Sequence, residues 1–458
     1  MNAWTLGPGD VESLAADEVR FLQSNGVTAG DSIGWLGLNS PRPLALLRAC
    51  QQIGARFVPL NWRLAAPELA AIARDAGLQQ LLHDDAMRPL AEALHAQLAL
   101  PLPPAAGHQE GDVLLVYTSG TTGAPKGVIH TATGMRANAA AAIETQHFDA
   151  ATRVLAVLPL FHVGGLAIQV LPVLQAGGQL RLHERFDPGA WLAEVAGWRP
   201  TTSLLVPAIM RALIEHPDWE RTDLSSLAFV NSGSQIVPTA TIEAFHARGV
   251  PVAQVWGSTE TGPVSLVLRP AEAMRHVGSA GRPAPGVQVR LVGTDGAEVG
   301  AGEVGEIFVR GANLMRGYHR AADPEAFADG WFRSGDLARA DAEGYVTVVG
   351  RVREMIVSGG ENIHPAEIEN LLAGHPGVAE AAVVGVPDAR WGEVPVLVVV
   401  AQRGATVDAA SLQALFDARL ARFKHPRRLV IVDDLPKTAL GKVQRAELAR
   451  RIAAGSLS

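Results

Sequence analysis

The sequence contains a single cysteine, Cys50, among its 458 residues, so no internal disulfide can form. It has no run of about 18 uninterrupted apolar residues, so no membrane-spanning helix is expected. Residues 1–10 contain glycine, proline and acidic side chains and lack the basic and apolar pattern of a secretory signal peptide. We therefore expect a soluble, cytoplasmic protein in which Cys50 is a buried core residue rather than a reactive thiol.

An excess of basic residues is absent as well. The chain carries 39 Lys and Arg against 46 Asp and Glu, a net charge of −7, which argues against binding to nucleic acid. Low-complexity segments and internal repeats are also missing, because the 47 glycines and 29 prolines are dispersed along the chain. With 48% hydrophobic and 19% charged residues, the composition is typical of a globular protein, and the length predicts two or three domains.

The first third of the chain alternates between helical and extended patterns. Such alternation predicts an α/β fold with a largely parallel, doubly wound sheet. The segment 113–117 is continuously apolar, as in a strand that is buried on both faces. We expect helices over residues 11–24, 41–53 and 67–76, and strands over residues 32–38, 56–60, 81–83 and 113–117.

The pattern changes near residue 278. A β-rich subdomain is predicted over about 278–350, with strands at 287–292, 305–309 and 345–349. A small α+β unit is predicted from Arg353 onwards, with a helix at 365–372 and strands at 378–386, 394–401 and 428–432. The chain is therefore divided into a large N-terminal domain, 1–352, and a small C-terminal domain, 353–458.

A glycine-rich string occupies residues 117–127 and reads Tyr-Thr-Ser-Gly-Thr-Thr-Gly-Ala-Pro-Lys-Gly. Its glycines allow backbone N–H groups to approach an anion closely, while its hydroxyls and one lysine supply further donors. The string is not a Walker A loop. A polar surface turn is the alternative, but the composition indicates a loop that grips a polyphosphate. Its candidate ligands are Thr118, Ser119, Gly120, Thr121, Thr122, Gly123 and Lys126.

This string resembles the phosphate loop of the adenylate-forming superfamily, which includes acyl-CoA synthetases, aryl-CoA ligases, luciferases and peptide-synthetase adenylation domains. The resemblance extends from about Val27 to Leu448, through several motifs in the family's order, although the start is some tens of residues shorter than usual. It implies an ATP-dependent enzyme that converts a carboxylic acid to an acyl-AMP with release of pyrophosphate. A thiol, with coenzyme A as the favoured acceptor, then displaces AMP.

The string Trp256-Gly257-Ser258-Thr259-Glu260 is similar to a nucleotide-binding motif of this family. The resemblance implies that Trp256 stacks on adenine, where relatives usually have Tyr. It also implies that Thr259 contacts the α-phosphate and that Glu260 binds Mg²⁺, an ion that prefers oxygen ligands. Taken alone, Trp256 would more often be a core residue.

Three other segments resemble the walls of the nucleotide site. The turn that contains Gly233 and Ser234 is similar to the segment beside the adenine, where a glycine would let the backbone approach the base. Asp336 is expected to accept hydrogen bonds from the ribose hydroxyls, and Arg351 is similar to a second ribose contact. For Asp336 and Arg351 the alternative is a surface ion pair.

Two segments resemble the reaction centre. Lys442 ends the string 435–442, which looks like the family's C-terminal catalytic loop, so its ammonium would bridge the acyl carboxylate and the α-phosphate. His162, in 159–165, would lie near the reacting carboxylate, although a lone histidine is more often a core residue. It is not expected to act as a general base, because a carboxylic acid is already ionised at pH 7. The expected acyl pocket comprises Phe161, His162, Val163, Gly164 and Thr261.

The C-terminal domain contains the expected CoA site. Residues 358–365 resemble the loop that lines the pantetheine tunnel, with Ser358, Gly359 and Gly360 in it. Trp391 and the group Phe423, His425 and Arg427 resemble the nucleotide end of the CoA site in a benzoate-type ligase, although relatives may have Arg in place of His425. A solvated basic loop is the alternative.

Members of this family are thought to rotate the C-terminal domain between the two half-reactions. The resemblance places the hinge at Arg353, where relatives usually have Asp or Lys. A free-standing adenylation enzyme that loads a carrier protein is the enzymatic alternative, and a non-catalytic nucleotide-binding relative is the other. We expect a monomer or a homodimer.

The identity of the acid stays open at this stage. The expected pocket segments 161–170, 207–213 and 261–266 are mostly apolar and contain no Asp to pair with an α-amino group. This favours a fatty or aromatic acid over an amino acid. Arg211 could pair with the second carboxylate of a diacid, although exposure on a helix surface is the simpler interpretation.

Overall fold

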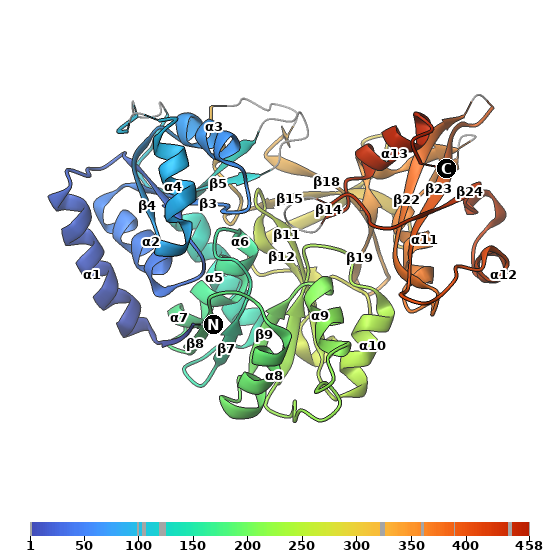
Figure 1. Cartoon of the computed structure of the whole chain (residues 1–458), viewed down its shortest axis with the longest axis horizontal. Helices are drawn as coiled ribbons and strands as arrows, with labels where there is room; N and C mark the ends of the chain where they lie inside the picture. Colours follow the sequence, from blue (N-terminus) through green and yellow to red (C-terminus); the bar gives the residue numbers. More distant parts are fainter. Residues whose placement is uncertain are drawn as a thin grey trace.

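The N-terminal sheet of the computed structural model has six strands in the order β16-β6-β5-β3-β2-β4 and lies at the upper left of Figure 1. Its strands β2, β3, β4 and β5 are parallel, whereas β6 and β16 join antiparallel at one edge. The bounds are β2 Ser32–Leu36, β3 Arg56–Leu60, β4 Leu78–His83, β5 Asp112–Thr118, β6 Lys126–Thr131 and β16 Gly317–Tyr318. The structure describes residues 2–98, 100–102, 107–118, 125–320, 326–358, 361–388, 390–437 and 442–457.

Helices cover both faces of this sheet. Side chains of β2 such as Ile33 pack with α1 and α2, whereas Leu36 and Val58 pack with α3 and α4. Strands covered on both faces are buried along their length, which is why their sequences are apolar without alternation. The helices are α1 Pro8–Ser24, α2 Pro41–Ile53, α3 Ala66–Ala76 and α4 Arg88–His95.

Helix α2 shows how the local sequence sets the helix bounds. Pro41 occupies the first turn, where a missing N–H costs nothing, and Gly54 ends the helix in the left-handed region at φ +81°. The helix buries Cys50 completely, which confirms the expectation of a core residue. Burial raises the pKa of this thiol well above its usual value.

The second sheet has eight strands in the order β1-β8-β7-β9-β10-β11-β12-β13. Its central strands β8, β7, β9, β10 and β11 are parallel, and its edges are antiparallel. The strands are β1 Ala3–Leu6, β7 Arg153–Ala156, β8 Gln179–His183, β9 Thr202–Leu205, β10 Phe229–Ser232, β11 Val252–Ser258, β12 Gly262–Val267 and β13 Arg282–Pro283. Its helices are α5 Ala132–Gln146, α6 Val163–Gly165, α7 Leu171–Gln175, α8 Pro188–Gly197, α9 Pro207–Ile214 and α10 Thr239–Ala247.

An antiparallel sheet and a C-terminal unit complete the chain. The antiparallel sheet comprises β14 Val287–Val292, β15 Val304–Gly311, β17 Phe327–Ala328, β18 Trp331–Ala340 and β19 Val346–Arg351. The C-terminal unit, at the right of Figure 1 beside α9 and α10, has a five-stranded sheet with three helices. Its elements are β20 Ile356–Ser358, β21 Glu361–Ile363, α11 Pro365–Leu372, β22 Val378–Asp388, β23 Gly392–Ala401, α12 Ala409–Arg419, β24 Arg428–Val432 and α13 Arg445–Ala453.

The predicted fold class, α/β with doubly wound sheets, a β-rich subdomain and a small α+β C-terminal domain, is confirmed. The predicted division after residue 352 falls within a short 3₁₀ turn, η4 Val352–Glu354, and stays a prediction. In the part of the chain that the structure describes, no helix has the length and apolar character to cross a bilayer.

Candidate active site

Lys442 lies where the C-terminal unit meets the N-terminal sheets. Burial lowers the pKa of its ammonium, and the nearby Arg351 lowers it further, while Asp336, Glu354 and Glu260 oppose the shift. Lys442 also acts electrostatically on His162. The structure therefore brings together residues that are separated by up to 280 positions in the sequence, counted from 162 to 442.

Asp336 is held from two sides. Its Oδ2 accepts a 2.9 Å hydrogen bond from the indole Nε1 of Trp256, and its Oδ1 accepts a 2.8 Å bond from Arg351 Nε. Asp336 and Arg351 stand opposite each other in the β18–β19 ladder, which fixes their approach. Each carboxylate oxygen can accept a second hydrogen bond, so Asp336 stays able to bind hydroxyl groups.

The turn between β11 and β12 carries Glu260 towards the glycine-rich string. Glu260 Oε1 accepts a 3.2 Å hydrogen bond from the Tyr318 hydroxyl, and the Lys126 ammonium lies 5.0 Å from the centre of the Tyr318 ring. Thr259, in the same turn, is half-buried. A carboxylate next to a cation and a phenol can share a Mg²⁺ ion with the phosphates of a nucleotide, so this donor set fits that ion.

Thr261 holds the turn itself. It is fully buried, and its Oγ1 accepts a 2.8 Å hydrogen bond from the backbone N–H of Ser258. The Thr261 side chain is therefore engaged within the turn, and its place in the acyl pocket stays a prediction.

Two glycines of the nucleotide motifs are required by backbone packing. A Cβ atom at Gly233 would lie 2.4 Å from the carbonyl oxygen of Val255, and one at Gly257 would lie 2.4 Å from that of Gly262. Contacts this short exclude any side chain. Gly233 is thus explained by the contact between β10 and β11 as well as by the expected approach to a base. Ser234, which follows it, has a φ of +67°.

His162 is half-buried, and its buried Nε2 has no hydrogen-bond partner among the described residues. Burial lowers its pKa to about 3, with Arg63 and Lys442 contributing, so the imidazole is neutral at pH 7. Its ring packs against Phe161 at a centroid distance of 4.3 Å. A neutral imidazole near Lys442 with an unpartnered Nε2 can donate or accept a hydrogen bond, but it does not supply a positive charge.

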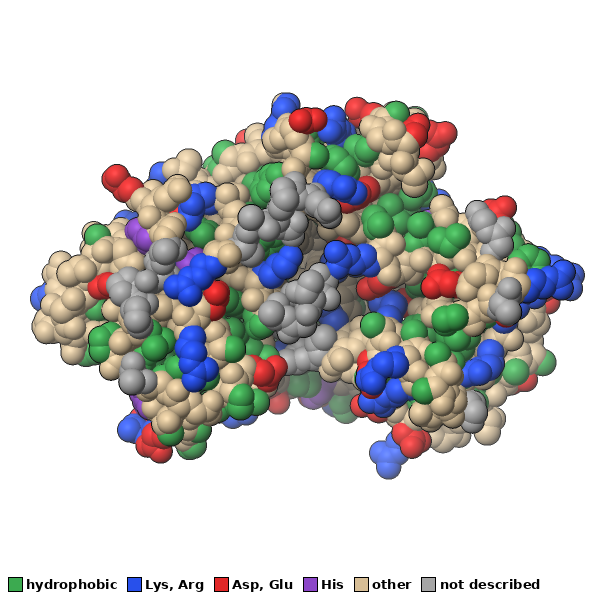
Figure 2. All heavy atoms as spheres, turned by 90° about the horizontal axis from the view of Figure 1, so that it is seen from above, with side chains coloured by type: hydrophobic (Ala, Val, Ile, Leu, Met, Phe, Trp, Pro, Cys, Tyr) green, Lys and Arg blue, Asp and Glu red, His purple; other side chains and the backbone are tan. Residues whose placement is uncertain are grey.

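Part of the predicted site lies outside the described residues. Ser119, Gly120, Thr121, Thr122 and Gly123 belong to this group, as do Gly359 and Gly360. The flanking residues Thr118 and Lys126 are described: Thr118 Oγ1 donates a 3.4 Å hydrogen bond to the carbonyl of Lys126. Figure 2, which views the molecule from above, shows a hollow in the middle of the surface with Lys and Arg side chains at its rim. The positive charge of these side chains suits the binding of a polyphosphate.

The expected CoA surface is present in part. Trp391 and Phe423 are 37% and 40% exposed, which is unusual for large aromatic side chains, and the Arg427 guanidinium lies 5.7 Å from the Trp391 ring centre. His425 is different, because it is buried and both ring nitrogens have partners, Gln413 Nε2 at 3.1 Å and the carbonyl of Leu420 at 3.2 Å. His425 therefore makes hydrogen bonds within its own domain, and its role in CoA binding stays a prediction.

Ser358 ends β20 and is buried, at 9% exposure. Arg353 is exposed in the η4 turn between β19 and β20, so its side chain does not restrain the connection between the two domains.

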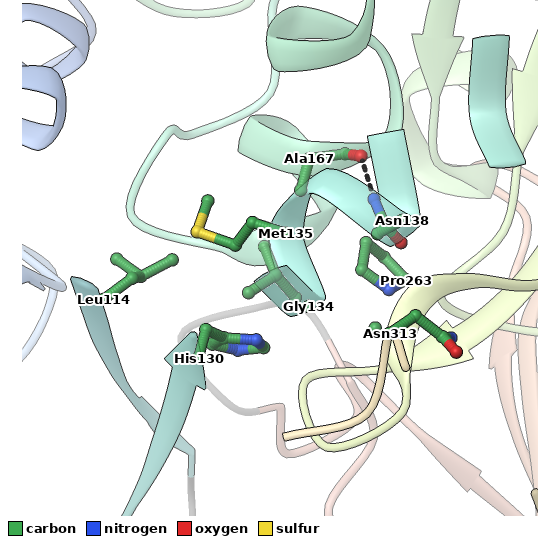
Figure 3. Close-up of a pocket in the computed structure, with 10 residues that line it drawn as sticks. Leu114, His130, Gly134, Met135, Asn138, Ala167, Pro263 and Asn313 are labelled. Carbon is green, nitrogen blue, oxygen red and sulfur yellow. Dashed lines mark hydrogen bonds between the residues drawn. The ribbon is translucent and has the colours of Figure 1, made fainter. Parts of the chain in front are cut away.

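Sequence reasoning missed a small cavity next to the reaction centre. Figure 3 shows His130, Met135, Asn138 and Pro263 around it, contributed by β6, α5 and β12. Four of its lining residues fall in the pocket segments expected from the sequence, 161–170 and 261–266: Val163, Ala167, Gly262 and Pro263. The available signal was the occurrence of a histidine and an asparagine, His130 and Asn138, among small and apolar residues.

Comparisons with known proteins agree with this arrangement. The AMP-binding enzyme family model matches residues 10–319, and the model of the AMP-binding enzyme C-terminal domain matches residues 367–442. The chain is 43% identical to an indoleacetate–CoA ligase of Aromatoleum aromaticum, over 97% of this chain and 92% of the relative. It is 42% identical to a feruloyl-CoA synthase of an Amycolatopsis species, over 94% and 90%.

A solved structure gives the same result. The o-succinylbenzoate CoA synthetase of Bacillus subtilis, in complex with its acyl-adenylate intermediate, superposes with a TM-score of 0.84 at 30% sequence identity. The match covers 96% of this chain and 92% of the synthetase. The resemblance drawn from the motifs is confirmed: this chain belongs to the AMP-binding enzyme family and is an acid–thiol ligase of the acyl-CoA synthetase type.

Proposed function

We propose that this enzyme activates an aromatic carboxylic acid with ATP and transfers it to coenzyme A, with the residues of the site in the following roles. The observation that carries the proposal is the position of Lys442, which the C-terminal unit delivers to Glu260, Asp336 and His162. This arrangement corresponds to the first half-reaction, in which an acid carboxylate attacks the α-phosphorus of ATP and pyrophosphate leaves.

The nucleotide would be held at three points. Asp336 accepts hydrogen bonds from the ribose hydroxyls, Lys126 meets the phosphates, and Trp256, whose edge is fixed by Asp336, presents a ring face to the adenine. Thr259 contacts the α-phosphate in this assignment, and residues 119–123, which are outside the described residues, keep their predicted role as phosphate ligands. Glu260 and the phosphates would hold Mg²⁺, which neutralises charge on the leaving pyrophosphate.

Lys442 would stabilise the negative charge that develops between the carboxylate and the α-phosphate. The bond from the carboxylate oxygen to phosphorus forms while the bond from phosphorus to the pyrophosphate oxygen breaks, so no proton has to move. A preformed cation in a buried site is effective here because it needs no reorganisation during the reaction. The neutral His162 imidazole orients the carboxylate by a hydrogen bond.

The second half-reaction would use the other face of the C-terminal domain. After rotation about Arg353, the loop 358–365 admits the CoA thiol, which attacks the acyl carbonyl and displaces AMP. Trp391, Phe423 and Arg427 form the surface for the nucleotide end of CoA, since the aromatic rings are exposed and a guanidinium lies beside one of them.

The acid proposed here is aromatic, of the arylacetic or cinnamic kind. The names of the indoleacetate–CoA ligase and the feruloyl-CoA synthase support this class. The pocket next to His162 is neutral, since its lining contains no Asp, Glu, Lys or Arg. Arg211, considered above for a diacid, is engaged with the C-terminal unit instead.

A carrier-protein thiol is the second candidate acceptor, and a cytoplasmic monomer or homodimer completes the proposal. The test is release of AMP and pyrophosphate with purified enzyme across benzoic, arylacetic, cinnamic, fatty and dicarboxylic acids, with and without CoA. We expect CoA-dependent AMP release with arylacetic or cinnamic acids. ATP–pyrophosphate exchange without thioester formation from free CoA would favour a carrier protein, and an absence of exchange would contradict the proposal.

A further inference from the structure

A cavity lies directly behind the proposed reaction centre. It is lined by residues of three segments that also carry the site: Val163 follows His162, Gly262 follows the Glu260 turn, and His130 lies in β6, the strand that begins at Lys126. Its volume is about 10 Å³, enough for one water molecule.

The lining of the cavity is uncharged. Leu114, Met135, Val163 and Pro263 supply apolar surface, and the polar side chains are amides and one imidazole. A charged group of either sign would lose its hydration there without an ion-pair partner, which is costly. The cavity thus suits a neutral group and disfavours a second carboxylate, a sulfonate or an ammonium.

Two hydrogen-bond acceptors lie close to Gly262, and one of them, Asn138 Oδ1, already accepts a bond from the N–H of Val264. A Cβ atom at Gly262 would lie 2.7 Å from the carbonyl oxygen of Asn313 and 3.3 Å from Asn138 Oδ1, so both oxygens line this corner. The donor group of Asn138 is already used, since Nδ2 donates a 2.7 Å bond to the carbonyl of Ala167, drawn as a dashed line in Figure 3. A ligand group that donates a hydrogen bond matches this corner better than one that only accepts.

Two residues that line the cavity, His130 and Asn313, have a buried polar atom without a hydrogen-bond partner among the described residues: His130 Nε2 and Asn313 Oδ1. His130 is 6% exposed. Figure 3 shows the ring projecting from β6 into the space between Gly134 and Asn313. Burial lowers the pKa of His130 to about 4, so the ring is neutral at pH 7 and has one acceptor nitrogen and one N–H. A buried polar atom without a partner costs free energy, which a ligand can recover.

Met135 is the side chain that can make room. It is half-buried, whereas Asn138 is fixed by bonds to Ala167 and to the N–H of Val264 at 3.1 Å. Methionine has three rotatable bonds, adapts to irregular shapes and makes favourable contacts with aromatic rings. Met135 is therefore the lining side chain that would have to move to widen the cavity from the size of one water molecule to that of a ring.

We propose that this cavity receives the far end of an aromatic acid, and that His130 binds a neutral hydrogen-bond donor, a phenolic hydroxyl or a ring N–H, on that ring. The inference rests on the proposed function, because it places the acid carboxylate at His162 and Lys442. It goes beyond it by naming the chemical group that the pocket selects.

The test compares matched acids in CoA-dependent AMP release. The series are cinnamate, 4-hydroxycinnamate and 4-methoxycinnamate for the hydroxyl, and indole-3-acetate with its N-methyl analogue for the ring N–H. In at least one series, kcat/KM for the donor-bearing acid is expected to exceed that of its matched acids by about tenfold or more, the value of one buried hydrogen bond. Ratios near one in both series overturn the inference.

Variants of His130 locate the effect. In His130→Leu, the ratio of kcat/KM between the donor-bearing acid and its matched acids is expected to fall to about three or less. His130→Gln keeps a hydrogen-bond acceptor and is expected to restore part of this ratio. The control is His183→Leu, which removes an equally buried histidine from β8 and should retain the wild-type ratio. An unchanged ratio in His130→Leu overturns the inference. If that variant does not fold, the wild-type series and His130→Gln decide.

The proposed function and this inference fail in different ways. If no acid supports AMP release, the proposed function is wrong and the inference falls with it. If acids are activated but the matched pairs do not differ, only the role of His130 is wrong.

Discussion

Arg211 Nη1 donates a 2.9 Å hydrogen bond to the backbone carbonyl of Ala379, across the boundary between the two domains. Arg211 belongs to α9 of the N-terminal domain, and Ala379 belongs to β22 of the C-terminal unit. Arg211 Nη2 also lies 3.8 Å from Glu380 Oε1. Since the same orientation of the C-terminal unit delivers Lys442 to the site, this contact stabilises the arrangement proposed for adenylation.

Replacing Arg211 by Ala should therefore slow only the first half-reaction. One hydrogen bond and a half-exposed ion pair together contribute roughly 1 kcal/mol, so ATP–pyrophosphate exchange should fall by about three- to tenfold. Thioester formation from isolated acyl-AMP should not fall. Arg221→Ala is the control, since Arg221 pairs with Asp218 within one domain. An equal loss in both half-reactions would show that Arg211 does not act through domain orientation.

Lys442→Ala should damage adenylation far more than thioester formation. The ammonium is buried among Glu260, Asp336 and Arg351, and the charge that it meets develops only in the first step. Removing one such donor typically costs about 10²–10³ in rate. The measurement supplies acyl-AMP and CoA to the variant and compares that rate with ATP–pyrophosphate exchange. Lys437→Ala, in the same segment but paired with Glu380, is the control and should lose far less.

Glu260→Gln should weaken the use of Mg²⁺ and ATP without unfolding the protein. The carboxylate stands in a half-buried turn, where its Oε1 accepts a bond from Tyr318, and not in a hydrophobic core. Raised Mg²⁺ concentrations should restore part of the exchange rate. Glu272→Gln, in a surface pair with Arg282, is the control. Wild-type rates of ATP–pyrophosphate exchange by Glu260→Gln at ordinary Mg²⁺ concentrations would contradict the role of Glu260 as a Mg²⁺ ligand.

Arg353→Pro should hold the enzyme in the adenylating orientation. The η4 turn has 3₁₀ geometry, whose φ near −60° is compatible with proline, and proline prevents the change in φ that a hinge requires. ATP–pyrophosphate exchange should stay within about tenfold, or roughly 1.4 kcal/mol, of wild type. Thioester formation from acyl-AMP should be very slow.

Arg353→Ala separates loss of the side chain from loss of rotation and should support both half-reactions. Equal loss of both activities in Arg353→Pro would instead indicate misfolding. Near-normal turnover would place the hinge elsewhere.

His130 should make the protein sensitive to acid. Its folded-state pKa is about 4, lowered by burial from 6.5, so between these values the unfolded chain binds more protons. Burial of neutral His130 therefore does not lower the stability above pH 6.5. As the pH drops from 6.5 towards 4, protonation of His130 in the unfolded chain lowers the free energy of unfolding. From pH 7 to pH 5 the loss is about 2 kcal/mol larger than in His130→Gln. Denaturant titrations measure this, with exposed His95→Gln as the control; equal losses in wild type and His130→Gln would contradict it.

The sequence by itself determined the family and the elements. Helix 41–53 and the strands 56–60, 287–292 and 428–432 follow the predicted bounds, because proline, glycine and apolar runs act locally. Other bounds shifted by a few residues, as for β4, which begins at Leu78 instead of Leu81. The nucleotide-binding motifs could also be recognised from the sequence, because each motif consists of adjacent residues that form one turn.

The tertiary structure decided which of those residues face the site. His425 and Thr261 belong to strings that resemble binding motifs. In the folded protein, however, the side chain of each forms a hydrogen bond within its own domain. The helical pattern around Arg211 predicts a surface residue. Arg211 forms a contact between the domains only because β22 lies beside α9 in the folded protein. His130 could not be recognised from its strand, because its unpartnered nitrogen exists only once β6, α5 and β12 close around it. Burial and partnership depend on distant segments, and no local pattern encodes them.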